Sequence, residues 1–118
     1  MQSNKDKGKQ GEDLAAQYLL DKAYQILERN WRYRHAEVDL IASKGNRLHF
    51  VEVKTRYSVR YGMPEESFNR DKMRSLKLAA EAYQLAHPEW KYLQFDIVSI
   101  IMLNNAVQEI RLFEDVYF

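Results

Sequence analysis

The sequence contains no cysteine, and it also lacks any long apolar run. Without cysteine the chain can form no disulfide, no thiolate metal site and no cysteine nucleophile, which agrees with a reducing compartment. Without a long apolar run it has neither a membrane span nor a signal peptide. We therefore expect a cytoplasmic protein with no membrane partner.

The sequence also has little net charge, because 18 basic residues nearly balance 17 acidic ones. A protein that binds nucleic acid over its whole surface is usually more basic, so any such role must come from local clusters. A length of 118 residues with 46% hydrophobic content predicts one compact domain. We expect this domain over residues 8–118, after a flexible polar terminus at residues 1–7.

Two alternating apolar runs meet at Gly45-Asn46, and this pattern predicts a β-hairpin between Ala36 and Arg56. Glycine at the first central position suits a type II′ turn, which needs a positive φ there. A two-residue turn fixes the register, so partners step outward one residue at a time. The predicted pairs include Lys44 with Arg47, Ile41 with Phe50, Asp39 with Glu52, and Glu37 with Lys54.

The predicted contact between Asp39 and Glu52 brings two like charges together. Such a pair destabilises a sheet unless something compensates it, and a divalent cation would do so. Mg²⁺ takes oxygen ligands and is commonly held by one or two carboxylates, with Mn²⁺ as an alternative. Lys54 projects from the same face as Glu52, about 7 Å further along the strand.

The alternative is that these charges are solvated, with Lys54 and Glu37 forming a surface salt bridge worth little. The apolar residues of the hairpin argue against it, because they occupy both faces and predict a strand pair covered on both sides. One face is expected to carry Ile41, Leu48 and Phe50, and the other Val38, Leu40, Val51 and Val53.

A helical pattern from about Gly8 to Lys22 precedes the hairpin, and the glycines at 8 and 11 leave room for close approach. Glu12 lies at the margin of the apolar stripe and can point towards the sheet. The alternative for Glu12 is a first-turn glutamate that the helix dipole favours.

The remaining elements give the order α-β-β-β-α-β-β. Strands are predicted at residues 24–33, 91–102 and 106–113, and a second helix from Ser67 or Asn69 to Ala86. Arginine, lysine and tyrosine gather around the hairpin and at the start of the second helix, a pattern that suits a phosphate backbone. The alternative is that these residues cap the sheet or form a solvated helix face. The candidate nucleic-acid-binding residues are Arg32, Arg34, Arg56, Tyr57, Arg60, Tyr61, Arg70, Lys72 and Arg74.

Three segments, GKQGEDLAAQYL, NWRYRHAEVDLIA and LHFVEVKTR, carry a family resemblance. Over nearly the whole chain the sequence resembles the YraN-like family of small uncharacterised bacterial proteins and, more distantly, archaeal Holliday-junction resolvases. Both belong to the PD-(D/E)XK nuclease superfamily. The resemblance implies a restriction-endonuclease-like α/β fold, with three α/β/α layers around a central mixed five-stranded sheet.

The resemblance also implies roles for individual residues. Asp39 matches the motif aspartate, Glu52 the second acidic ligand and Lys54 the motif lysine. Glu12 matches the first-helix glutamate of the resolvase branch. One position departs from the family pattern, because Ala36 stands where glycine is usual.

The chemistry implied is metal-assisted hydrolysis of phosphodiester bonds. Asp39, Glu52, Glu12 and the Val53 carbonyl would hold one or two Mg²⁺ ions, and Lys54 would orient or deprotonate a water. Three functions remain open. The first is an endonuclease for branched or distorted DNA, as a homodimer where two strands must be cut. The others are a nucleic-acid-binding accessory protein with little or no catalysis, and a protein-interaction module with structural charges.

Overall fold

The computed structural model describes residues 4–57 and 70–116 of the chain. The order α-β-β-β-α-β-β is confirmed, and the first helix begins four residues before Gly8. Neither helix in these described ranges is long and apolar enough to cross a membrane. The elements are α1 (Asn4–Asp21), β1 (Gln25–Tyr33), β2 (Ala36–Lys44), β3 (Arg47–Arg56), α2 (Arg70–Ala86), β4 (Tyr92–Leu103) and β5 (Ala106–Phe113).

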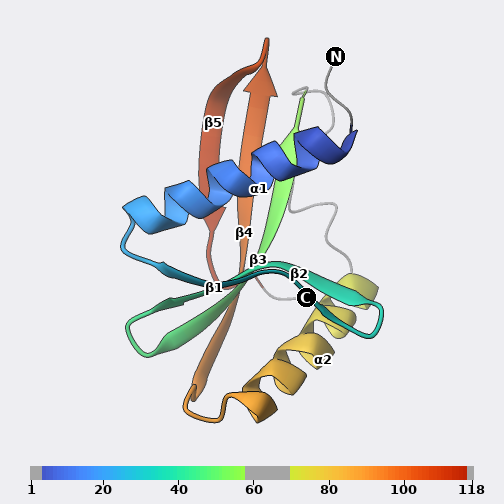
Figure 1. The fold of residues 1–118 in the computed structure, drawn as a ribbon, viewed down its shortest axis with the longest axis vertical. Helices are drawn as coiled ribbons and strands as arrows, with labels where there is room; N and C mark the ends of the chain where they lie inside the picture. Colours follow the sequence, from blue (N-terminus) through green and yellow to red (C-terminus); the bar gives the residue numbers. More distant parts are fainter. Residues whose placement is uncertain (1–3, 58–69, 117–118) are drawn as a thin grey trace.

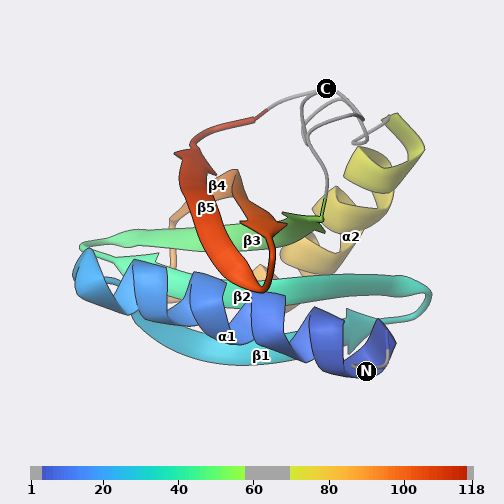
Figure 2. The same cartoon turned by 90° about the horizontal axis from the view of Figure 1, so that it is seen from above.

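The five strands form one mixed sheet in the order β1-β2-β3-β4-β5. All neighbours are antiparallel except β3 and β4, which are parallel and are joined through α2. The views in Figures 1 and 2 show α1 lying across one face of the sheet and α2 against the other. The predicted α/β fold with three layers and a mixed five-stranded sheet is therefore confirmed.

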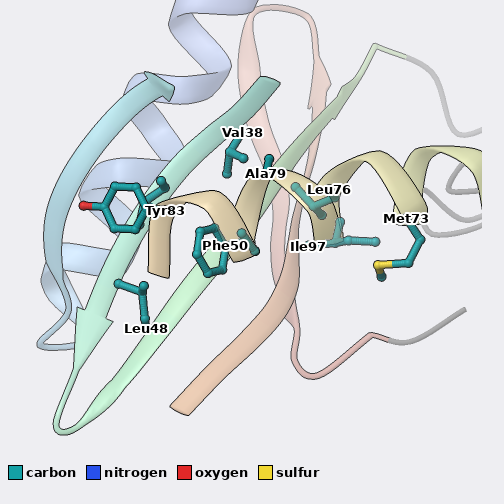
Figure 3. Packing of buried hydrophobic residues seen from close by; sticks show 10 residues of the cluster. Val38, Leu48, Phe50, Met73, Leu76, Ala79, Tyr83 and Ile97 are labelled. Atoms are coloured by element: carbon teal, nitrogen blue, oxygen red, sulfur yellow. The ribbon is translucent and has the colours of Figure 1, made fainter. Parts of the chain in front are cut away.

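Each face of the sheet carries its own apolar core, because the hairpin is buried on both sides. The core beneath α2 includes Phe50, Met73, Leu76 and Tyr83, and Figure 3 shows Phe50 beside Tyr83 and Met73 further along the helix. The opposite core lies under α1 and is built from Ala15, Ala16, Leu19, Tyr24, Leu40, Ala42, Val51, Val98, Ile100 and Met102. The helical spacing of the apolar residues accounts for both contacts, since it gives each helix one stripe to bury.

The hairpin register is confirmed from the turn outward to Leu40 and Val51, and Gly45 has the positive φ, 61°, that the turn requires. The ladder then ends. β2 stays paired with β1 as far as Ala36, and β3 stays paired with β4 as far as Arg56, so the two strands of the hairpin form a fork that is visible in Figure 1.

The two predicted pairs beyond this point are wrong as ladder pairs. Asp39 and Glu52 lie just past the last rung, and the Glu37 carboxylate pairs with Arg32 at 3.0 Å. The physical reason is that the Asp39 carboxylate takes the backbone N–H of Val53, which a neighbouring strand would otherwise bond.

Alternation along β2 also breaks at Asp39. Val38 and Ile41 both belong to the core beneath α2, whereas Leu40 belongs to the core beneath α1. The prediction that placed Val38 on the same face as Leu40 is therefore wrong. At this level of β1, Asn30 has a φ of 53°, a left-handed conformation that asparagine tolerates better than most residues. Both strands thus leave regular geometry beside the candidate site.

Candidate active site at the fork between two strands

The fork places a carboxylate between the two diverging strands. Asp39 Oδ2 accepts a hydrogen bond of 2.8 Å from Val53 N, so its side chain spans the gap that the ladder leaves. Glu52 precedes Val53 on β3 and is almost completely buried, with a relative exposure of 7%. The two acidic residues predicted to converge therefore come from the two arms of the fork.

Two lysines compensate the charge of Glu52. Lys72, on α2, places its Nζ atom 2.5 Å from Glu52 Oε1, and Lys54 Nζ lies 3.6 Å from the same oxygen. The short distance between Lys54 and Glu52 confirms that they share a face of β3. The counter-charge that the sequence analysis assigned to a divalent cation is thus supplied, in the chain alone, by two ammonium groups.

The pKa values show how closely these groups interact. Burial and then the negative charge of Glu52 raise the pKa of Asp39 to about 7, although the hydrogen bond from Val53 opposes the shift. Burial and the neighbouring Lys72 lower the pKa of Lys54. Burial also acts to lower the pKa of Lys72, but hydrogen bonds to Glu52 and Lys54 outweigh it and raise that pKa. Lys72 is therefore the firmer cation of the two.

Glu12 faces the same region from α1 without joining the two other carboxylates closely. Its Oε2 atom accepts a hydrogen bond of 2.9 Å from Asn30 Nδ2, and its charge contributes to raising the pKa of Asp39. Across residues 4–57 and 70–116, no three His, Cys, Asp or Glu side chains lie close enough to hold one ion. The role of Glu12 as a metal ligand stays a prediction.

Asp39 and Glu52 nevertheless fit a hard divalent cation. They offer carboxylate oxygens, which Mg²⁺ and Mn²⁺ prefer, from two strands that meet at one point. The raised pKa of Lys72, whose ammonium group contacts Glu52, shows that positive charge is stabilised beside this carboxylate. Asp39 and Glu52 therefore suit a divalent cation, whereas Glu12 is a predicted third ligand.

Two cavities lie on either side of the fork, and Asp39 lines both of them. The larger, of about 560 Å³, lies between the β1–β2 turn and the start of α2 and is lined by residues that include Glu37, Glu52, Asp71 and Lys72. The smaller, of about 430 Å³, is lined by Gly8, Glu12, Asp39, Val53, Lys54, Thr55 and Tyr57. Solvent and small ligands can thus reach the carboxylates from both faces of the sheet.

The smaller cavity depends on a close approach between α1 and β3. A Cβ atom at Gly11 would overlap the side chain of Thr55, whereas a Cβ atom at Gly8 would meet no atom of the described residues within 4 Å. The expectation that glycine leaves room for close approach is therefore confirmed for Gly11 and wrong for Gly8.

The candidate nucleic-acid-binding residues occupy different positions around these cavities. Arg32, Arg34, Arg70 and Arg74 are exposed, on the β1–β2 hairpin and the first turns of α2, but they do not line the larger cavity, whereas the exposed Tyr57 lines the smaller one. Arg56 is half-buried, and its Nε atom has no hydrogen-bond partner among the described residues. Lys72 lies inside the site, whereas Arg60 and Tyr61 lie outside the described residues, as do the predicted helix caps Ser67 and Asn69.

Sequence reasoning missed two contributions to the site. Asn30 holds Glu12, and its position inside a strand was the available signal, since asparagine is uncommon there. Lys72 contacts Glu52, and helical spacing could have revealed this because Lys72 stands four residues before the buried Leu76. The exposed Arg74, in contrast, pairs with Asp71 at 3.9 Å.

Comparisons with known proteins agree on one family. Residues 11–100 match the model of the uncharacterised protein family UPF0102. A UPF0102 protein of Rhodococcus opacus is 41% identical over 111 residues, which cover 93% of this chain and 94% of the relative. A UPF0102 protein of Syntrophomonas wolfei is 47% identical over 100 residues, or 84% and 87% of the two chains. A UPF0102 protein of Dictyoglomus thermophilum is 44% identical over 105 residues, with coverage of 88% and 89%.

Proposed function

This chain belongs to the uncharacterised protein family UPF0102, and we propose that it is a metal-dependent endonuclease that hydrolyses phosphodiester bonds in branched or distorted DNA. The observation that carries the proposal is the meeting of Asp39, Glu52 and Lys54 at the fork between β2 and β3. The resemblance of the sequence segments that carry these three residues to PD-(D/E)XK nucleases supports the proposal.

Asp39, Glu52 and the carbonyl of Val53 would hold a Mg²⁺ or Mn²⁺ ion, with Glu12 as a further ligand. When bound, such an ion polarises a phosphate and lowers the pKa of a water molecule. The buried Glu52, the half-buried Asp39 and the two cavities that Asp39 lines are suited to this chemistry.

Lys54 would act on the water or on the charge that develops on the phosphate. Because burial and the charge of Lys72 lower its pKa, Lys54 releases its proton more readily than an exposed lysine. A lysine in this state can accept a proton from a nucleophilic water or donate one to a leaving oxygen. The proximity of Glu52, at 3.6 Å, keeps its ammonium group directed into the site.

The basic residues around the fork support DNA as the substrate. His35 and Asp71 line the larger cavity, and the exposed Arg34 and Arg70 precede them in the chain, so both arginines are available to a phosphate backbone near this cavity. Arg56 follows Lys54 on the same face of β3, and its Nε donor lacks a partner among the described residues. Few such contacts predict weak, salt-dependent binding that is indifferent to base sequence.

The test is a cleavage assay on four-way junctions, forks, nicked duplexes, linear duplexes and single strands, with Mg²⁺, Mn²⁺ or a chelator. We expect wild-type cleavage of branched substrates with either ion, and a loss of at least about 100-fold in Asp39→Ala and Lys54→Ala. Asp21→Asn is the matched control, because Asp21 lies at the far end of α1 from Glu12 and hydrogen-bonds Gln17.

One observation favours a second function, a nucleic-acid-binding accessory protein without catalysis. Lys72 already neutralises Glu52, and no cluster of three acidic or histidine ligands is formed by the described residues. Gel-shift measurements on the same substrates in Ca²⁺ separate the functions. Binding in Ca²⁺ together with no cleavage in Mg²⁺ or Mn²⁺ would favour the accessory protein. The absence of both binding and cleavage would favour a protein-interaction module.

A further inference from the structure

The contact between Lys72 and Glu52 joins two layers of the fold at the centre of the site. Lys72 Nζ lies 2.5 Å from Glu52 Oε1, closer than the 3.6 Å of Lys54 from the same oxygen. The Glu52 side chain is 8% exposed and that of Lys72 is 38% exposed, so the pair is partly shielded from water. An ion pair in this setting is stronger than one on an open surface.

The packing of α2 fixes this position of Lys72. Met73 and Leu76, one and four residues after it in the helix, are buried against the sheet and set the rotation of α2. The exposed Arg74 pairs within the helix, with Asp71, and does not reach the sheet in this way. The ammonium group of Lys72 is therefore directed to Glu52 by the core beneath it.

The charges at the fork make this ammonium group significant. Asp39 and Glu52 come from the two arms of the fork, and the Lys72 ammonium group lies against Glu52, the more deeply buried of the two. A lysine side chain is positively charged at neutral pH. The positive charge of Lys72 therefore lies against the same carboxylate, Glu52, that the proposed function assigns to a metal ion.

We propose that Lys72 is an internal counter-ion that competes with a divalent cation for the Glu52 carboxylate. It holds the site together without metal, and it weakens metal binding because the ion must displace it. Once displaced, Lys72 is free to contact a phosphate of the substrate. This inference rests on the proposed function, since it assumes that Glu52 is a metal ligand.

The test is titration calorimetry of the metal-free protein with Mn²⁺, for wild type and Lys72→Met. Methionine keeps the apolar stem and removes the charge, so we expect Mn²⁺ affinity to rise by about tenfold, the change that a loss of about 1.4 kcal/mol of competition produces. Arg74→Met is the control. Arg74 lies two residues after Lys72 and pairs with Asp71, so this variant removes one positive charge from the same helix without touching Glu52. Its Mn²⁺ affinity should stay within about twofold of wild type.

Thermal unfolding gives a second readout that a merely structural lysine would not produce. Without metal, Lys72→Met should lower the Tm, because Glu52 loses its closest counter-charge. With saturating Mn²⁺ the difference from wild type should close, because the ion replaces the lysine. Lys72→Gln, which keeps a hydrogen-bond donor near Glu52, serves in the same way should the methionine variant fail to fold.

The outcomes separate this inference from the proposed function. If wild type binds Mn²⁺ through Asp39 and both Lys72 variants bind it no more tightly, the competition is overturned and the metal site stands. If no variant binds Mn²⁺ in a manner that Asp39→Ala abolishes, the metal-dependent function is itself overturned. A Tm difference that persists unchanged at saturating Mn²⁺ would also overturn the competition.

Discussion

Two regions of the sheet carry an aspartate in opposite surroundings, since Asp96 is buried among polar partners and Asp39 is half-buried at the fork. Asp96, on β4, is 1% exposed and is bonded by Gln94 Nε2 and by the backbone N–H of Asp115, both at 2.9 Å, while His49 Nδ1 lies 2.6 Å from its other oxygen. Asp39 accepts the N–H of Val53 and is repelled by Glu52. Polar partners enclose the first carboxylate, and the second opens onto two cavities.

The comparison distinguishes a structural acid from a candidate functional one. The partners of Asp96 come from β3, from β4 and from the segment after β5, so the carboxylate ties three parts of the chain together. At the fork, the geometry leaves carboxylate oxygens facing cavities and brings like charges together. Unfavourable electrostatics that the fold maintains are more typical of a functional site than of a structural network.

Replacing the enclosed acid should have the largest effect on stability. Asp96→Ala removes the acceptor for Gln94 and for the Asp115 N–H and leaves His49 without its partner, so we expect the free energy of unfolding to fall by about 3–5 kcal/mol. Urea denaturation at pH 7 measures this change.

The same replacement at the fork is the control. Asp39→Ala should not lower the free energy of unfolding at pH 7, because relief from the charge of Glu52 offsets the lost bond to Val53. Equal losses in the two variants would show that Asp39 is as structural as Asp96, and the comparison would fail.

Acid titration should reveal a second, smaller difference between the two regions. The pKa of Asp39 is about 7 in the folded chain and 3.8 ordinarily, so the folded state holds a proton that the unfolded state releases. Stability from this group is therefore present below about pH 4 and is lost as pH rises to about 7. We expect the free energy of unfolding of Asp39→Asn to rise relative to that of wild type across this interval, by at most about 4 kcal/mol.

Urea denaturation of wild type and Asp39→Asn at a series of pH values checks this sign. Asparagine cannot titrate, so the difference between the two curves isolates Asp39 from the other carboxylates. A difference that stays constant from pH 4 to pH 8, or that favours wild type as pH rises, would contradict the raised pKa.

The sequence predicted the elements and the residues of the fork, but not the fork itself. Gly45-Asn46 and the alternation from the turn to Leu40 and Val51 set the register, and the register brings Asp39 and Glu52 to the same end of the hairpin. Where the ladder stops depends on the Asp39 side chain and on the backbone of Asn30, which local patterns do not encode.

The compensation of charge at the fork was also beyond the sequence. Two like charges on the hairpin predict a cation, whereas the structure supplies Lys72, which lies 20 residues after Glu52 and reaches it through the packing of α2. Tertiary contacts of this kind depend on how a helix is rotated against a sheet. The spacing of two residues in the sequence does not reveal that rotation. Helical spacing from Leu76 gives the only hint.

The smallest effect should come from the close approach of α1 to β3 at the edge of the fork. Gly11→Ala places a methyl group against the Thr55 hydroxyl, next to Lys54, so α1 must shift and we expect a loss of about 1–3 kcal/mol. Gly8→Ala, in the same helix, meets no atom of residues 4–57 and 70–116, and its free energy of unfolding should rise by about 0.5–1 kcal/mol from helix propensity. Thermal unfolding of both variants, and of Gly11→Ala combined with Thr55→Ala, measures the contact. Because Thr55→Ala removes the clashing oxygen, the double variant should be more stable than the two separate losses predict, and simple additivity would show that α1 and β3 are not held together there.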